Sequence, residues 1–213
     1  MTPGMIIAVD GPAASGKGTI AKALARHYNL PHLDTGLLYR AVAATVRRLE
    51  LDPTREADAV AACDFDELTL ADPVLREEEI GKLASVVSAH PLVRAALLQR
   101  QKRFAHQEGG AVLDGRDIGT VIAPDADAKL FIRATPTIRA RRRHNELISH
   151  GASVSFDQVL ADIRARDTRD SSRSTAPLVP ANDAALLDTS FLSIEASIEK
   201  AIALVEARRR KEG

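Results

Sequence analysis

Short apolar runs and longer amphipathic stretches alternate along most of this chain of 213 residues. The apolar runs predict strands at residues 5–9, 32–34, 111–114, 128–132 and 186–188. Apolar positions at helical spacing predict helices over 17–28, 37–49 and 77–89, a helix that opens at Pro91, and a final helix around 194–205. Residues 52–72 are acidic with weak periodicity and hold at most one short strand, near Leu68. This order of elements is typical of an α/β protein.

One helical stripe changes from apolar to charged along its length. Ser155-Phe-Asp-Gln158 is a capping-box pattern that opens a helix, and the apolar stripe of this helix leads to Arg166, Asp170 and Arg173. Burial of charged groups is costly unless they are paired. Either the helix end leaves the core, or the segment is mobile and brings two guanidinium groups over a phosphate cluster. Residues 171–180, rich in Ser, Thr and Pro, favour a flexible lid.

The residues between the first strand and the first helix have the pattern G-x-x-x-x-G-K. They are Gly11, Pro12, Ala13, Ala14, Ser15, Gly16, Lys17, Gly18 and Thr19. A glycine-rich loop at this position turns its backbone N–H groups toward an anion at the positive end of the helix dipole. Lys17 adds an ammonium that can reach the β- and γ-phosphates of a nucleotide. Gly18 stands where the pattern expects Ser or Thr, so the usual side-chain ligand for Mg²⁺ is missing there.

Two further strand ends carry polar residues. Asp34-Thr-Gly-Leu-Leu-Tyr-Arg40 follows the second strand, at the carboxyl end where open α/β sheets bind ligands. The third strand ends in Asp114 and continues as Gly115-Arg-Asp-Ile-Gly119. A carboxylate at this strand end, facing a phosphate loop, can organise Mg²⁺ through waters.

Charge is balanced overall, with 29 basic and 29 acidic residues, so no global attraction to nucleic acid or to an anionic membrane is expected. Its uneven placement, acidic over 50–79 and basic over 129–173, suggests one basic face that handles an anion. An RNA patch is an alternative for the run that contains Arg139, Arg141, Arg142 and Arg143. The aromatic content of 3% leaves few stacking platforms, which favours a solvated face beside the anion site.

The cysteine and histidine content argues against a disulfide-stabilised protein and against a metal site formed by these residue types. Cys63 is the single cysteine, which excludes a disulfide within the chain, and the six histidines show no spacing typical of metal ligands. No stretch resembles a signal peptide or approaches the length of a membrane span, so we expect a cytoplasmic protein.

Four motifs, in this order and spacing, resemble those of the bacterial cytidylate kinases, within the nucleoside monophosphate kinase family. They are the phosphate loop at 11–19, Leu33-Asp-Thr-Gly-Leu-Leu-Tyr-Arg40, Asp114-Gly-Arg-Asp-Ile-Gly-Thr120 and Arg166-Asp-Thr-Arg-Asp-Ser-Ser-Arg173. The run Ala176-Pro-Leu-Val-Pro180 is similar too, and a loop with Gly at position 18 is usual in this family.

The resemblance implies a P-loop three-layer α/β fold with a five-stranded parallel sheet. It implies a single kinase domain over 1–213, with a monophosphate-binding insertion at roughly 36–107, a mobile lid at 151–184 and a monomeric state. Between residues 64 and 76 the chain is shorter than long forms of the family, so no complete small antiparallel sheet is expected in the insertion.

The activity implied is transfer of the γ-phosphate of ATP to CMP or dCMP. Residues 11–19 would hold ATP, and Mg²⁺ would be bound by nucleotide phosphates and water, without direct protein ligands. The residues implied to contact the acceptor are Thr35, Arg40, Ser85, Arg94, Arg116, Asp117, Arg166, Asp170 and Arg173. Among these, Arg116, Arg166 and Arg173 would act with Lys17 in catalysis. Asp117 would accept a hydrogen bond from the cytosine amine, where uracil presents a second acceptor.

Three other functions remain open at this point. A P-loop kinase could act on UMP, on AMP or on a hydroxyl acceptor. A hydroxyl acceptor would need a base near its oxygen, and Asp34 or Asp117 could serve. A nucleotide-dependent switch is a second possibility, but the Asn-Lys-x-Asp guanine motif of GTPases is absent. An RNA-binding module that uses the arginines of 139–143 is the third.

Overall fold

The structure of the chain is a computed structural model that describes residues 4–149 and 151–212. Over these residues, five strands form one sheet in the order β2-β3-β1-β4-β5. The strands are β1 (Met5–Asp10), β2 (His32–Asp34), β3 (Gly110–Gly115), β4 (Ala128–Arg133) and β5 (Ala185–Asp188). β1 pairs in parallel with β3 and β4, and β4 pairs in parallel with β5. The expected five-stranded parallel sheet is confirmed.

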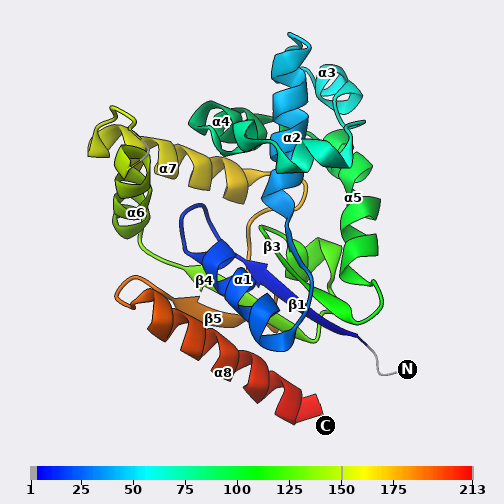
Figure 1. The fold of residues 1–213 in the computed structure, drawn as a ribbon, viewed down its shortest axis with the longest axis vertical. Helices are drawn as coiled ribbons and strands as arrows, with labels where there is room; N and C mark the ends of the chain where they lie inside the picture. The colour runs from blue at the N-terminus through cyan, green and yellow to red at the C-terminus, as the bar shows by residue number, and fades with distance from the viewer. Residues whose placement is uncertain (1–3, 150, 213) are drawn as a thin grey trace. The chain divides into compact units, whose positions relative to one another are not determined.

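The chain divides into two compact units, one made of Met1–Leu33 with Ala105–Gly213 and the other of Asp34–Phe104. In the first unit, α1 (Lys17–Tyr28) and α8 (Ile194–Glu212) pack against each other and against the sheet (Figure 1). Their shared core contains apolar residues of both helices and of the strands, among them Ile7, Leu24, Leu130 and Val205. The central strands are apolar and buried along their length because a parallel sheet is covered on both faces.

A helical hairpin in the first unit is formed by α6 (Pro136–Ser149) and α7 (Phe156–Ser172), which pack together around Ala140, Val159 and Ile163. The predicted capping box opens α7: the Gln158 N–H donates to Ser155 Oγ at 3.2 Å, and the Ser155 N–H donates to Gln158 Oε1 at 3.0 Å. The helix runs unbroken through Arg166 and Asp170 to Ser172.

The second unit is helical. It holds α2 (Thr35–Arg48), α3 (Glu56–Ala61), α4 (Glu78–Val87) and most of α5 (Pro91–Ala105), with short 3₁₀ turns η1 (Glu67–Ala71) and η2 (Pro73–Arg76). The short strand that the pattern allowed near Leu68 is not formed. Asp66 and Asp72 instead accept hydrogen bonds from the backbone N–H groups of Leu68 and Val74, which favours two capped turns.

Helix α2 begins earlier than its apolar periodicity predicts, at Thr35 instead of residue 37. The reason is a cap: the Asp34 carboxylate accepts a hydrogen bond from the Gly36 N–H at 2.9 Å. Within residues 4–149 and 151–212, no helix is both long enough and apolar enough to cross a membrane.

Candidate active site

The phosphate loop connects β1 to α1, as its sequence predicts, and two of its glycines are required by the backbone. At Gly11 a Cβ would lie 2.2 Å from the carbonyl oxygen of Ile132, so only glycine permits this close approach. Gly16 has a φ of 89°, in the left-handed region, and caps the N-terminus of α1. Lys17 is then the first residue of the helix.

Two carbonyl groups of the phosphate loop accept hydrogen bonds from side chains that lie more than a hundred residues later in the chain. Arg139 donates to the carbonyl of Ala13 at 3.1 Å, and the Thr189 hydroxyl donates to that of Ser15 at 2.9 Å. In a trans peptide the N–H points opposite to the C=O of the same unit. The N–H groups of Ala14 and Gly16 therefore point to the other side, as an anion-binding loop requires.

A buried carboxylate lies beside Lys17. Asp114, whose side chain is 0% exposed, has Oδ2 at 3.5 Å from Lys17 Nζ and Oδ1 at 2.8 Å from His32 Nε2. Burial raises the pKa of Asp114, but the charge of Lys17 and the hydrogen bond with His32 outweigh it and hold this pKa below its usual value. The site thus keeps an ionised carboxylate between the loop and the sheet.

A second buried carboxylate, Asp10, fixes the turn that follows β3. Its two oxygens accept hydrogen bonds from the consecutive N–H groups of Ile118 and Gly119, each at 2.8 Å. Burial raises the pKa of Asp10 to about 7 against the opposing effect of these two bonds. The turn that Asp10 holds is the one that carries Arg116 and Asp117.

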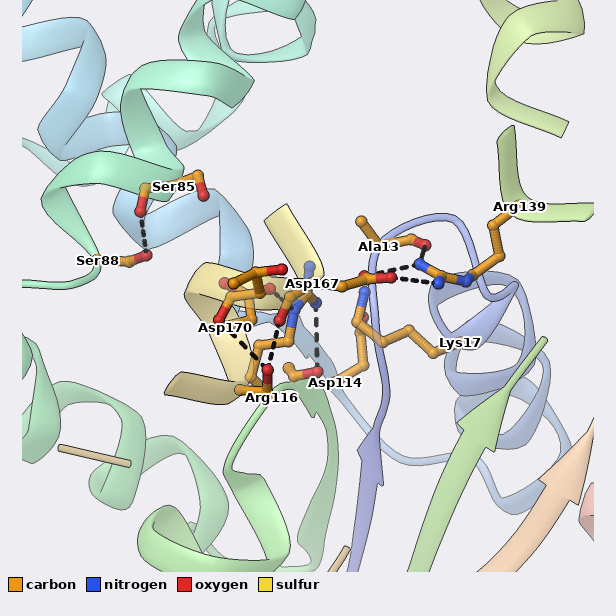
Figure 2. Close-up of polar contacts among 12 residues, drawn as sticks. Ala13, Lys17, Ser85, Ser88, Asp114, Arg116, Arg139, Asp167 and Asp170 are labelled. Atoms are coloured by element: carbon orange, nitrogen blue, oxygen red, sulfur yellow. Dashed lines mark hydrogen bonds and ion pairs between the residues drawn. The ribbon is translucent and has the colours of Figure 1, made fainter. Parts of the chain in front are cut away.

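Helix α7 brings its charged residues to this same turn (Figure 2). Arg116 Nε donates to Asp170 Oδ2 at 2.8 Å, and the side chain of Asp170 is only 5% exposed. Burial raises the pKa of Asp170, yet Arg116, Arg166 and Arg173 together lower it below its usual value. Four of the predicted acceptor residues are therefore close enough to interact electrostatically. Asp170 is buried in the last turn of α7, so the alternative in which this end of the helix leaves the core is wrong.

The other predicted acceptor residues lie in the unit Asp34–Phe104. Ser85 on α4 is 3% exposed, and its Oγ has no hydrogen-bond partner among the described residues. The Ser88 hydroxyl donates to the Ser85 carbonyl at 3.2 Å (Figure 2). Arg94 Nη1 donates to the Ser88 carbonyl at 3.3 Å. The Arg94 guanidinium also lies over the Tyr39 ring, 5.4 Å from its centroid. These contacts form a buried polar cluster in which the Ser85 hydroxyl makes no hydrogen bond to a described residue.

Thr35 and Arg40 lie on α2 in that unit. Thr35 is 4% exposed. Arg40 Nη1 donates to the carbonyl groups of Leu75 at 2.6 Å and Glu77 at 3.2 Å. These two bonds hold the guanidinium beside η2, close to the face of α4 that Gly81 leaves open.

Comparison with known proteins identifies the family. The sequence profile of the cytidylate kinase family matches residues 7–207. This chain belongs to the cytidylate kinase family. A cytidylate kinase of Xanthobacter autotrophicus is 60% identical over 205 residues, covering 96% of this chain and 99% of the relative. One from a Methylobacterium species is 58% identical over 205 residues, with 96% and 98% covered.

A solved structure supports the fold alone. An uncharacterized protein from Eubacterium ventriosum matches with a TM-score of 0.55 at 16% identity, over 95% of this chain and 99% of the other. The family model and the curated relatives, and not this structure, confirm the resemblance to the cytidylate kinases at the level of the family.

The expectation for the arginines of α6 is wrong at two of four positions. Arg139 is 3% exposed and forms a bidentate ion pair with Asp167, and Arg142 donates to the Thr189 carbonyl at 2.6 Å. They are not a solvated face, because their guanidinium groups are held inside the kinase fold by a carboxylate and by carbonyls. Burial lowers the pKa of Arg142.

Sequence reasoning also missed three residues of the site. The sequence patterns assign no role to Asp10 or His32, nor to Asp167 within the motif of residues 166–173. Asp10 could have been noticed as a charged residue that ends an otherwise apolar strand directly before the phosphate loop. No local pattern marks His32 or Asp167, because their partners lie 82 and 28 residues away.

Proposed function

We propose that this chain transfers the γ-phosphate of ATP to CMP or dCMP, giving ADP and CDP or dCDP. The observation that carries the proposal is the match to the cytidylate kinase family over residues 7–207, nearly the whole chain. Two further observations support it. The N–H groups of the phosphate loop point away from Arg139 and Thr189, which bind its carbonyl groups, and three arginines interact electrostatically with Asp170.

The donor is held by residues 11–19. The loop amides and the N-terminus of α1 attract the phosphates, and Lys17 reaches them as a mobile ammonium. Lys17 Nζ lies 3.5 Å from Asp114 Oδ2, and we infer that it exchanges this ion pair for a contact with a phosphate when ATP binds. The contact between His32 Nε2 and the other oxygen of Asp114, at 2.8 Å, would remain.

For the acceptor, we assign Thr35, Arg40, Ser85, Arg94, Arg116, Asp117, Arg166, Asp170 and Arg173. The acceptor oxygen already belongs to a phosphate, so in-line transfer needs charge neutralisation and positioning more than a strong base. The guanidinium groups of Arg116, Arg166 and Arg173 supply positive charge where the transferring phosphoryl group gathers negative charge. The described unit Asp34–Phe104 supports an acceptor-binding insertion at 36–107, and residues 151–184 would act as the lid.

Base choice rests on Asp117 and on the cluster around Ser85. The carboxylate oxygens of Asp117 can accept a hydrogen bond from the exocyclic amine of cytosine, whereas uracil would face them with a carbonyl oxygen. The Ser85 hydroxyl and Arg94 have donors for the acceptor edge of the ring. Asp170, held by Arg116, has one carboxylate oxygen oriented by that pair and a second available to a ribose hydroxyl.

Mg²⁺ enters the proposal as the ion that accompanies ATP, and the residues present fit it. A Cβ at Gly18 would lie 3.7 Å from Asp114 Oδ2, so the residue without a side chain borders the buried carboxylate. Asp114 would hold the ion through water, as hard oxygen ligands do. When bound, Mg²⁺ would supply neutralisation of the phosphate charge.

Release of ADP, measured with CMP, dCMP, UMP, AMP and a hydroxyl acceptor such as a nucleoside, tests the proposal. CMP and dCMP should give the highest kcat/KM, and ATP without an acceptor should be hydrolysed slowly. Lys17→Met serves as the inactive control. Poor turnover of CMP beside good turnover of AMP, UMP or a nucleoside would replace the proposed substrate. Light scattering at assay concentration tests the monomeric state that we propose with it.

A further inference from the structure

Four of the five N–H donors of Arg139 bind other residues of the described chain. Nε donates to the Ala134 carbonyl at 2.9 Å, Nη1 donates to the Ala13 carbonyl at 3.1 Å and to Asp167 Oδ1 at 2.9 Å, and Nη2 donates to the other oxygen of Asp167. The side chain is 3% exposed. A guanidinium used in this way joins the elements that it contacts.

The elements joined are the phosphate loop and α7. Ala13 belongs to the loop, and Arg139 lies between it and Asp167 (Figure 2). In the sequence, Asp167 follows Arg166 on the helix. The same two elements also meet through apolar contacts, since Ala13 and Ala14 pack against the cluster of Ala140, Val159 and Ile163 that binds α6 to α7. A polar bridge and an apolar contact therefore both fix α7 against the loop that receives ATP.

Two carboxylates of α7, one turn apart, form ion pairs with arginines of two different segments. Asp167 pairs with Arg139, and Asp170 pairs with Arg116 on the turn after β3. Residues three apart on a helix lie on the same side, one turn apart, so the two ion pairs to different partners restrict rotation of α7 about its own axis. Arg166, which precedes Asp167 directly, takes its direction from this restriction.

We propose that Arg139 and Asp167 are positioning residues that couple ATP binding in the phosphate loop to the placement of Arg166, Asp170 and Arg173. The proposal rests on the function proposed above. Occupation of the loop fixes the Ala13 carbonyl, Arg139 transmits this order to Asp167, and the acceptor residues of α7 are ordered with it. By thermodynamic linkage, the acceptor strengthens ATP binding by the same factor.

Hydrogen exchange with the full chain tests the coupling without an acceptor. A non-hydrolysable ATP analogue with Mg²⁺ should slow amide exchange in the phosphate loop and also in residues 163–172 of α7. In Asp167→Asn, which keeps the size of the side chain but loses its charge, the loop should still be protected while α7 exchanges as in the free protein. Arg139→Lys should behave alike, because an ammonium cannot hold the carbonyl and both carboxylate oxygens together.

Calorimetry then measures the coupling as the ratio of CMP dissociation constants without and with the ATP analogue. This ratio should be about tenfold in the parent protein and about one in both variants. The matched control is Arg143→Gln, which breaks the surface ion pair with Glu146 on the same α6 helix and should leave the ratio unchanged. Thermal unfolding of each variant identifies any loss of fold.

The outcomes separate this inference from the proposed function. Absence of nucleotide protection in the loop of the parent protein would remove both. Protection of the loop without any effect on α7, or an unchanged ratio in Asp167→Asn, would overturn the coupling while the kinase function stands.

Discussion

His32 Nε2 lies 2.8 Å from Oδ1 of Asp114, and this histidine is the partner of a carboxylate that is fully buried next to the phosphate loop. A hydrogen bond to a buried charge contributes more than one between neutral groups. His32→Leu should therefore lower the free energy of unfolding at neutral pH by about 1.5–3 kcal/mol. Chemical denaturation measures this change.

The control for His32 is another histidine–aspartate pair, His106 with Asp125, at 3.0 Å but with both side chains well exposed. His106→Leu should change stability by less than about 1 kcal/mol. The pKa of Asp114 is lowered in the fold, so its stabilising contribution is complete above the unfolded value of 3.8 and declines as pH falls below it. Equal effects of the two substitutions would contradict the role given to His32.

The raised pKa of Asp10 predicts that the free energy of unfolding depends on pH with the opposite sign. Its folded pKa is about 7 against 3.8 for an unperturbed carboxyl, so the folded chain binds more protons than the unfolded chain between these values. Stability attributable to Asp10 should therefore fall as pH rises from 4 to 7, by roughly 4 kcal/mol, and level off above pH 7. Asp10→Asn should lack this dependence.

Denaturation of the parent protein and Asp10→Asn at several pH values isolates that effect as their difference. Asn retains one acceptor oxygen but turns an amide toward the second backbone N–H, so the turn at Ile118 and Gly119 should also loosen. A difference in unfolding free energy that stays constant from pH 4 to 7 would show that Asp10 is ionised throughout.

The local elements were predictable because their causes are local. The capping box at Ser155, the apolar run of β1 and the glycine loop each specify their structure through neighbouring residues. The early start of α2 at Thr35, capped by Asp34, is not predicted by apolar periodicity because a polar cap leaves no apolar residue to mark it.

The inner part of the site was not predictable for a different reason. Arg139 looked like one of four solvated arginines, and only the placement of Asp167 and the Ala13 carbonyl makes it a buried bridge. Asp10 likewise acquires its role from N–H groups more than a hundred residues away. Long-range pairs of this kind depend on how the sheet orders its strands, and local sequence periodicity does not encode that order.

Arg173 follows α7 and lowers the pKa of Asp170 together with Arg116 and Arg166. If it stabilises the transferring phosphoryl group, Arg173→Ala should reduce kcat by about 10³-fold, the lower range for such arginines. Arg143→Ala removes a guanidinium from the exposed pair with Glu146 and should leave kcat unchanged. Steady-state turnover with saturating ATP and CMP compares the two, and near-normal turnover of Arg173→Ala would exclude this role.

Asp117, 4% exposed at the start of the turn that Asp10 holds, is the proposed discriminator between CMP and UMP. Asp117→Ala should reduce the preference for CMP over UMP by about tenfold to a hundredfold, since one misread contact is worth about 1–3 kcal/mol. The ratio of kcat/KM values for the two acceptors reports the change. Asp125→Ala, an exposed aspartate, is the control, and an unchanged ratio in Asp117→Ala would assign base choice elsewhere.

Ser85 allows stability and substrate binding to be separated in one experiment. Its Oγ is buried without a hydrogen-bond partner among the described residues, so the folded chain gains nothing from this hydroxyl. Ser85→Ala should leave the free energy of unfolding unchanged or raise it by up to about 1 kcal/mol. If the hydroxyl donates to the cytosine ring, the same substitution should raise the KM for CMP about tenfold, equivalent to one hydrogen bond.

Ser88→Ala is the matched control, because the Ser88 hydroxyl already donates to the Ser85 carbonyl at 3.2 Å. Its removal should lower the free energy of unfolding by about 1 kcal/mol and change the KM for CMP less than Ser85→Ala does. The KM for ATP should stay constant in both variants. A Ser85→Ala protein that is destabilised and binds CMP normally would mean that the hydroxyl serves the packing of α4 and not the acceptor.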